Sequence, residues 1–166
     1  STDVEKKNFM RDAKEAEIVL QGVYRSTIED GQYGYHLSIL FNLGTDMEQA
    51  EGNSTENYRI IPANAFPTTQ SEVQTTWSSL YAGVYNANDF LERISSKINT
   101  YSDTDRQLAT LYIAEARALR AMFYFELVRR YGNIALMTNT EMSKQDPRTF
   151  VQVKPEKVYE FIDRKS

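Results

Sequence analysis

The sequence predicts an all-α protein, and three observations support this prediction. Glycine and proline are scarce, with 7 Gly and 4 Pro among 166 residues, whereas all-β sandwiches and barrels use many turn residues. The hydrophobic fraction of 41% and the aromatic fraction of 12% supply enough apolar surface for a packed core. Apolar residues recur every three or four positions over long stretches, as they do on one face of an α-helix.

The first helix is expected over residues 8–29. Its apolar stripe steps by three and four residues, and charged side chains fill the positions between. Asp30-Gly31 and Gly34 then end the pattern. The stripe consists of Phe9, Ala13, Ala16, Leu20, Val23, Tyr24 and Ile28.

A second apolar block runs from Tyr35 to Met47. Its spacing fits a helix that is buried on more than one side, and a short buried strand is the alternative. The stretch from residue 51 to residue 71 contains Pro62, Pro67 and many Asn, Thr and Ser side chains. Connections of this length inside compact domains are usually functional or disordered. We therefore expect a long irregular loop here.

Two long helices are predicted next, over residues 71–100 and 106–131. Between them, Ser102 and Asp105 have the spacing of a capping box. The second helix is rich in alanine, which has the highest helix propensity. Its last turn carries arginines, which suit the negative end of the helix dipole, and Gly132 fits the position just after a helix.

The remaining chain is expected to hold a short apolar segment and one more helix. Residues 134–137 are apolar and are expected to be extended or to form a buried loop. Pro155 suits the first position of a helix, with Val158, Tyr159 and Ile162 on its inner side. Because this helix has barely begun at Ser166, we expect residues 1–166 to be the N-terminal helical domain of a longer protein. No regular repeat period is present, so any solenoid of helix pairs would be a degenerate one.

Composition excludes several functional classes. The formal net charge is −4 and the isoelectric point is about 5.1, and no run of Lys and Arg exceeds two residues. Nucleic acid and anionic membranes are therefore not the expected partners. The sequence has no Cys and one His, which rules out Cys nucleophiles and multi-histidine metal sites within one chain. We expect no catalytic residues, no metal and no cofactor.

Acidic residues are the most plentiful chemically active groups. Asp46 and Glu48, with Glu51 and Glu56 close behind, could form the carboxylate pair that a glycoside hydrolase needs. Asp and Glu number 23, so acidic neighbours in a polar loop are expected by chance. A solvated loop is the favoured interpretation. The alternatives are a cation site formed by the same oxygens, although their spacing is not that of an EF-hand, and a carboxylate hydrolase.

Two ring side chains have competing interpretations. His36, beside Tyr33 and Tyr35, could be a ligand or a base, but a lone His at the edge of an apolar run is more often a packing residue. Trp77 could stack on a sugar only if it points outward. Its place on the apolar stripe with Leu80, Tyr81 and Val84 favours the core.

Charged residues also occur within the alanine-rich helix, at Glu115, Arg117 and Arg120. Since this helix is apolar nearly all round, we expect these charges to be buried and paired in a structural ion network.

The loop offers candidate ligand-binding residues. Flat aromatic faces, amides and a guanidinium together are what a neutral glycan requires, although the same groups could equally attach the loop to the body of the protein. These residues are Asn57, Tyr58, Arg59, Asn64 and Phe66.

Four motifs resemble those of the SusD/RagB family. The segment from Trp77 to Leu91 resembles the family pattern W-x-x-x-Y-x-x-I-x-x-A-N-x-x-L. The segment from Ala114 to Gly132 resembles the signature AEARxLRAxxYFxLVxxYG. The first helix and the PR and VYEFI segments near residues 147 and 158 also fit. Ala135 departs from the family, which usually has a proline there; we expect the turn to relax without a change of fold.

The resemblance implies tetratricopeptide-like helix pairs with long irregular loops. It also implies a cell-surface lipoprotein of Bacteroidetes-type bacteria, held at the outer membrane through an N-terminal lipid anchor that is absent from this chain. Such proteins capture a glycan, starch in the founding case, or another nutrient, and pass it to a SusC-like TonB-dependent transporter without hydrolysing it. The alternative is a helical interaction scaffold that has no small-molecule ligand. The signature residues are expected to specify the fold and not the sugar; they are Trp77, Tyr81, Asn88, Glu115, Arg117, Arg120, Tyr131 and Gly132.

Overall fold

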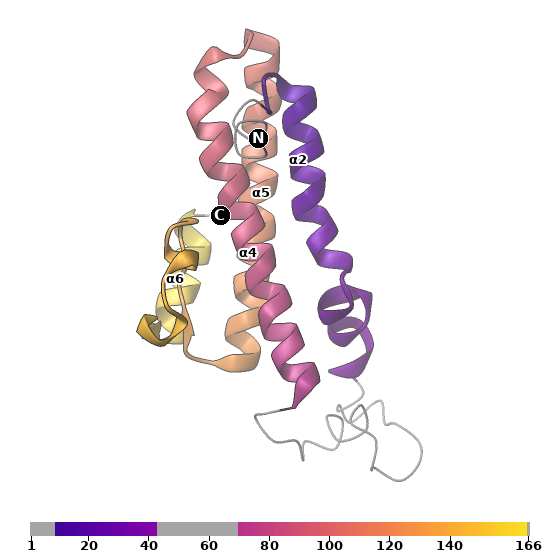
Figure 1. Ribbon diagram of the computed structural model, residues 1–166, viewed down its shortest axis with the longest axis vertical. Coiled ribbons are helices and arrows are strands. Elements are labelled where there is room, and N and C mark those ends of the chain that lie inside the picture. The colour runs from indigo at the N-terminus through magenta and orange to yellow at the C-terminus, as the bar shows by residue number, and fades with distance from the viewer. Residues whose placement is uncertain (1–8, 43–69, 166) are drawn as a thin grey trace. The chain divides into compact units, whose positions relative to one another are not determined.

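The computed structural model describes residues 9–42 and 70–165 (Figure 1). Within these ranges the chain divides into two compact units, residues 9–24 with 83–165 and residues 25–42 with 70–82. Nearly all regular structure in both units is helical, as predicted. Helix α4, Ser71–Lys97, contributes its residues 71–82 to the smaller unit and the rest to the larger one.

The first helix of the larger unit is α2, Ala13–Arg25. Four positions of the predicted stripe are buried, namely Ala13, Ala16, Leu20 and Val23. The prediction is wrong at the two ends of the stripe, since Phe9, Tyr24 and Ile28 are exposed.

Helix α2 begins at Ala13, later than the apolar pattern predicts, because Asp12 caps it. The Asp12 carboxylate accepts the backbone N–H of Glu15 at 2.8 Å, and the Glu15 carboxylate accepts that of Arg11 at 2.9 Å. Hydrogen bonds from Arg11 also lower the pKa of Glu15 to about 2. Just upstream, Met10 is fully buried with a φ of +72°. Local capping therefore overrides the apolar periodicity here.

Helices α4 and α5 confirm the two long helices predicted. A 3₁₀ turn follows α4, and α5 spans Asp103–Tyr131. The Ser102 hydroxyl accepts the N–H of Asp105 at 3.1 Å and donates to its carboxylate at 2.7 Å, so this residue caps α5 as predicted. At the other end Gly132 has a φ of +70°, and its N–H donates to the Val128 carbonyl at 3.0 Å.

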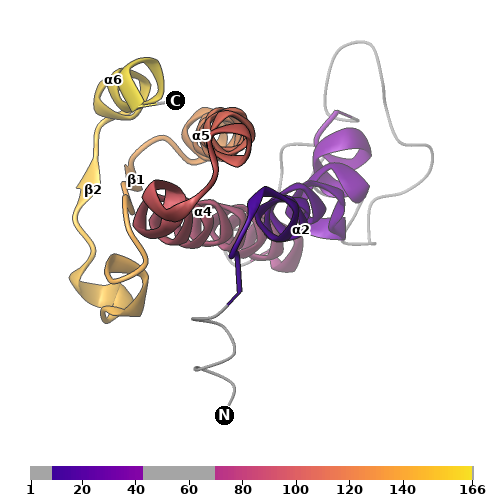
Figure 2. The same ribbon diagram turned by 90° about the horizontal axis from the view of Figure 1, so that it is seen from above.

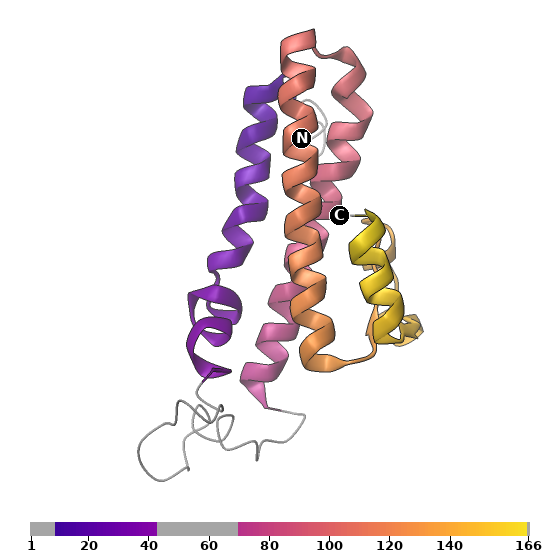
Figure 3. The same cartoon turned by 180° about the vertical axis from the view of Figure 1, so that it is seen from behind.

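The core of the larger unit lies where α2, the second part of α4, and α5 run side by side (Figures 1 and 3). Gly83 permits close packing of α4 on α5, because a Cβ there would lie 2.8 Å from the Phe123 ring. Deeply buried side chains from α4 and α5 fill this core; they include Val84, Ala87, Phe90, Ile94, Ala109, Ala116, Phe123, Tyr124 and Leu127.

After α5 the chain forms a small antiparallel ladder and one more helix. Strand β1, Ile134–Ala135, pairs with β2, Gln152–Val153, and helix α6 spans Pro155–Lys165. The apolar segment at residue 134 is thus extended, one of the two forms predicted. Helix α6 packs against α5, as the view down the helices shows (Figure 2).

The inner side of α6 differs from the prediction. Val158 is fully buried, but Tyr159 is 42% exposed. The ring that faces α5 belongs to Phe161, which meets Tyr124 edge-on with 5.5 Å between ring centroids. Residues 158 and 161 share a face because they lie three positions apart on the helix, whereas residue 159 turns about 100° away.

The smaller unit holds the first part of α4 and three short turns: a 3₁₀ turn at Ser26–Ile28 and π-helical turns at Asp30–Gly34 and His36–Leu40. Hydrogen bonds from residue i+5 to residue i close the π turns, for example from Phe41 N–H to the His36 carbonyl at 3.0 Å. The prediction of a helix buried on several sides from Tyr35 onward is wrong for the part described, since Leu37 is buried but Tyr35 and Ile39 are exposed. Residues 43–47 of that block lie outside the described residues.

Candidate functional site

The loop residues predicted to bind a ligand lie outside the described residues. This applies to Asn57, Tyr58, Arg59, Asn64 and Phe66, and also to the carboxylates of the rival hydrolase interpretation, Asp46, Glu48, Glu51 and Glu56. Both interpretations of this loop stay predictions.

Two exposed tyrosines mark the strongest candidate within the described residues. Tyr33 and Tyr35 are 40% and 37% exposed, and both lie in the segment 30–40, which we call the tyrosine turn. Aromatic rings that remain exposed on an ordered backbone provide flat apolar faces with a polar hydroxyl at the edge. Such faces suit the apolar face of a sugar ring and the hydroxyl groups at its rim.

The tyrosine turn is held against the first part of α4. The side chain of Gln32 is fully buried, and its amide nitrogen donates to the Ser79 carbonyl at 2.8 Å. Gly31 allows the backbone to approach this closely, because a Cβ there would lie 2.7 Å from Cβ of Ser79. The two exposed tyrosines therefore project from a backbone that is packed on a helix.

His36 provides a second attachment of the tyrosine turn. His36 is 7% exposed as a residue, and its Nδ1 lies 2.8 Å from the hydroxyl oxygen of the fully buried Thr76. The ring centroid is 5.6 Å from that of Tyr35. Burial lowers the pKa of His36, against the opposing charges of Glu72 and Asp30. These contacts favour the packing interpretation of this histidine over the ligand or base interpretation.

Trp77 is neither fully exposed, as a sugar-stacking residue would be, nor fully buried, as a core residue would be. Its side chain is half-buried, whereas Leu80 and Val84 on the same helix are fully buried. The indole lies against the ring of Tyr81, with centroids 4.9 Å apart and planes tilted by 54°. The predicted core position is therefore correct for Leu80 and Val84 and only partly correct for Trp77.

In the larger unit the signature residues form a buried polar cluster. Arg120 donates to the side-chain oxygen of Asn88 at 2.9 Å, and the amide nitrogen of Asn88 donates to the Met137 carbonyl at 2.7 Å. The Tyr124 hydroxyl donates to the same carbonyl at 2.7 Å and accepts the N–H of Met137 at 2.8 Å. The Arg120 guanidinium also lies 5.1 Å from the centroid of the Phe161 ring. These contacts tie α4, α5, α6 and the segment after β1 together.

The other charges of the signature differ from the ion network predicted. Glu115 is half-buried, and its carboxylate accepts the Tyr24 hydroxyl at 2.8 Å, which raises the pKa of that tyrosine. Arg117 is exposed, so the prediction that it is buried is wrong. The helix presents this residue to solvent because α5 has a polar face as well as an apolar one. Glu115 and Arg120 thus make separate contacts, Glu115 with Tyr24 of α2 and Arg120 with Asn88 of α4.

The end of the signature has a structural role. Tyr131 is half-buried at the last position of α5, and Gly132 makes the left-handed turn that leads into β1. Ala135, where the family usually has a proline, lies in β1 opposite Gln152. The chain continues as a paired strand at this point.

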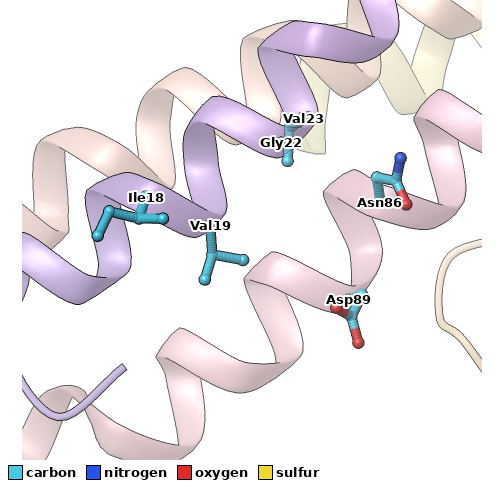
Figure 4. Close-up of a pocket in the computed structure, with 6 residues that line it drawn as sticks. All are labelled: Ile18, Val19, Gly22, Val23, Asn86 and Asp89. Carbon is cyan, nitrogen blue, oxygen red and sulfur yellow. The ribbon is translucent and has the colours of Figure 1, made fainter. Parts of the chain in front are cut away.

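A shallow hollow of about 260 Å³ lies between α2 and the second part of α4. Figure 4 shows Ile18, Val19 and Gly22 of α2 across from Asn86 and Asp89 of α4. Asp89 is committed to an ion pair with Arg93 at 2.9 Å. The hollow is smaller than the usual ligand pocket and has no aromatic side chain in its lining, so it is a poor candidate for a glycan.

Neither a metal-ligand cluster nor a membrane-spanning helix occurs in the described ranges. No three His, Asp or Glu side chains there are grouped closely enough to hold a metal ion. No helix among residues 9–42 and 70–165 combines the length and the apolar character needed to cross a membrane.

Two features of these sites are not among the predictions made from the sequence. The sequence marks Tyr33 and Tyr35 as neighbours of His36, and their interleaving with Gly31 and Gly34 is a signal for aromatic rings on a tight turn. The contact between Tyr124 and Met137 joins a helix to a later extended segment, and no local pattern signals it.

Comparison with known proteins places the chain in a family. Residues 3–163 match the SusD-like family described as starch-binding and associating with the outer membrane. A SusD homologue of Bacteroides thetaiotaomicron shares 67% sequence identity, with a TM-score of 0.95 over 99% of this chain and 31% of its own. A SusD superfamily protein of Bacteroides vulgatus has the same fold at 15% identity, with a TM-score of 0.80 over 95% of this chain and 34% of its own.

A curated relative gives the same assignment. A SusD-like protein of Formosa agariphila is 32% identical over 97 residues, which are 56% of this chain and 18% of the relative. The chain thus spans about a third of the solved homologues and less than a fifth of this relative. Because the family match covers nearly all of its residues, the chain belongs to the SusD-like family of starch-binding proteins that associate with the outer membrane.

Proposed function

We propose that this chain is part of a cell-surface protein that captures a glycan and passes it to a SusC-like TonB-dependent transporter. The observation that carries the proposal is the family match over residues 3–163, together with 67% identity to a SusD homologue. The family description supports carbohydrate binding and association with the outer membrane. Attachment through an N-terminal lipid anchor, delivery to the transporter and the absence of catalysis are parts of the proposal.

The geometry of the smaller unit supports the tyrosine turn as part of the capture surface. Tyr33 and Tyr35 expose aromatic faces from a backbone that Gln32 and His36 hold to α4. A rigid platform loses little conformational entropy when it binds, so its stacking contacts are retained as affinity. The predicted loop residues, Asn57 to Phe66, would add amide and guanidinium hydrogen bonds. No step of this capture requires a bond in the glycan to break.

A calorimetric screen of the protein against polysaccharides tests the proposal. We expect reversible binding to at least one glycan, with no release of reducing ends on prolonged incubation. The absence of binding to every glycan would favour the alternative, a helical interaction scaffold. Release of reducing ends would instead support the carboxylate hydrolase. Co-purification with a SusC-like transporter tests separately the association that delivery requires.

A further inference from the structure

His36 links the tyrosine turn to α4 across a large separation in sequence. Its Nδ1 and the Thr76 hydroxyl lie 2.8 Å apart although 40 residues separate them. Thr76 is fully buried and His36 is nearly so. Together with the bond from Gln32 to Ser79, this contact attaches the segment that carries Tyr33 and Tyr35.

The surroundings of His36 disfavour its charged form. Burial removes water from the imidazole, and this is the dominant influence on its pKa, which is lowered. Three influences act in the opposite direction: the charges of Glu72 from α4 and of Asp30 from the tyrosine turn itself, and a hydrogen bond with the backbone of Glu72. The Tyr35 ring lies next to the imidazole, with 5.6 Å between the ring centroids. The neutral imidazole is therefore the form that fits the packed turn.

We propose that neutral His36 holds the tyrosine turn against α4, and that mild acid releases the turn and thereby weakens glycan binding. The first half of this inference concerns the fold, and the second half depends on the proposed function. A histidine in a released turn regains an ordinary pKa of about 6.5. Below that pH the released turn binds more protons than the packed turn, so a falling pH favours release. Each pKa unit between the two states changes the equilibrium tenfold.

The composition of the chain makes this inference easy to test. His36 is the single histidine of the sequence, and histidine is the side chain whose ordinary pKa lies between pH 5 and pH 8. Its imidazole resonances can be followed by NMR in the unmodified chain without overlap from other histidines. A titration midpoint below 6.5 is expected, whereas a midpoint at or above 6.5 would overturn the proposal.

Hydrogen exchange measures the attachment of the turn without any glycan. The amides of Gly34 and Phe41 close the two π turns, and that of Gly132 caps α5 as an internal control. After correction for intrinsic exchange rates, we expect protection at Gly34 and Phe41 to fall severalfold from pH 7.5 to pH 5.5, with little change at Gly132. The variant His36→Asn, whose amide can still reach Thr76, should lose this pH dependence.

The result that would overturn the proposal is protection in the turn that does not change with pH, or that changes equally in His36→Asn. If that variant fails to fold, Thr76→Val serves instead, since it removes the hydroxyl but keeps a branched side chain in a buried position. Protection of the turn in Thr76→Val should then be low already at pH 7.5, and unaltered protection would contradict the proposal. A protein that binds no glycan at any pH would refute the proposed function, and the exchange data would still decide the role of His36.

Discussion

Asn88 of α4 and Arg120 of α5 are joined by a hydrogen bond of 2.9 Å between the guanidinium and the side-chain amide oxygen. Both side chains are buried, so the bond satisfies a charge that has little access to water. Burial lowers the pKa of Arg120 from its usual value, an effect that the neighbouring Arg117 reinforces. The amide that accepts this bond also anchors the Met137 carbonyl. Asn88 therefore serves both the helix pair and the segment that follows it.

Replacing Asn88 by alanine should be strongly destabilising. The change removes an acceptor from a buried guanidinium and a donor from a buried carbonyl, and we expect a loss of about 2–3 kcal/mol in the free energy of unfolding. Urea denaturation followed by circular dichroism measures this loss. Asn86→Ala, at an exposed position of the same helix, should change stability by less than ~0.5 kcal/mol. Equal effects of the two substitutions would contradict the role given to Asn88.

The hydroxyl of Tyr124 is expected to matter independently of its ring. Tyr124→Phe keeps the ring against Phe161 but removes the acceptor of the Met137 N–H and one of the two donors to the Met137 carbonyl, the other being the Asn88 amide. We expect a loss of about 1–3 kcal/mol, measured as a shift of the denaturation midpoint. Tyr159→Phe, at a position that is 42% exposed, is the matched control and should be close to neutral. A neutral Tyr124→Phe would mean that the backbone after β1 is held by other contacts.

Two glycines should respond to alanine in opposite directions. Gly132 has a φ of +70°, so Gly132→Ala forces a side chain into the left-handed region and should cost about 1–2 kcal/mol, although no atom lies within 4 Å of the added Cβ. Gly22 lies within α2 with equally open space around it. Because alanine is the better helix former, Gly22→Ala should stabilise the protein by about 0.5–1 kcal/mol. Thermal denaturation of both variants tests the sign, and a stabilising Gly132→Ala would be inconsistent with this helix end.

The long helices could be predicted from the sequence because their signals are local. Ser102, Asp105 and Gly132 mark the ends of α5 through contacts within a few residues, and the structure confirms each of them. The start of α2 was predicted too early because the apolar pattern continues upstream of Asp12, where a carboxylate cap decides the boundary. Two local signals compete at this boundary, the apolar pattern and the Asp12 cap, and the cap determines where the helix begins.

The partners of the signature residues could not be predicted in the same way. Arg120 lies against an amide from α4 and a ring from α6, and neither can be inferred from its own helix. Likewise, the exposure of Tyr33 and Tyr35 depends on how the turn packs on α4. The predicted ligand loop lies outside the described residues, and His36 and Trp77 are the residues with a binding role proposed from the sequence that the structure does describe.

The tyrosine turn is proposed as a glycan platform, and one calorimetric comparison tests this role directly. The glycan found in the screen is titrated into the parent protein, into the double variant Tyr33→Ala/Tyr35→Ala, and into the control Tyr159→Ala, which removes an exposed tyrosine of the other unit. We predict that the double variant, while still folded by circular dichroism, binds at least about tenfold more weakly, or ~1.4 kcal/mol, and that the control binds like the parent. A folded double variant with the affinity of the parent, or a control that loses as much affinity as the double variant, would contradict the account.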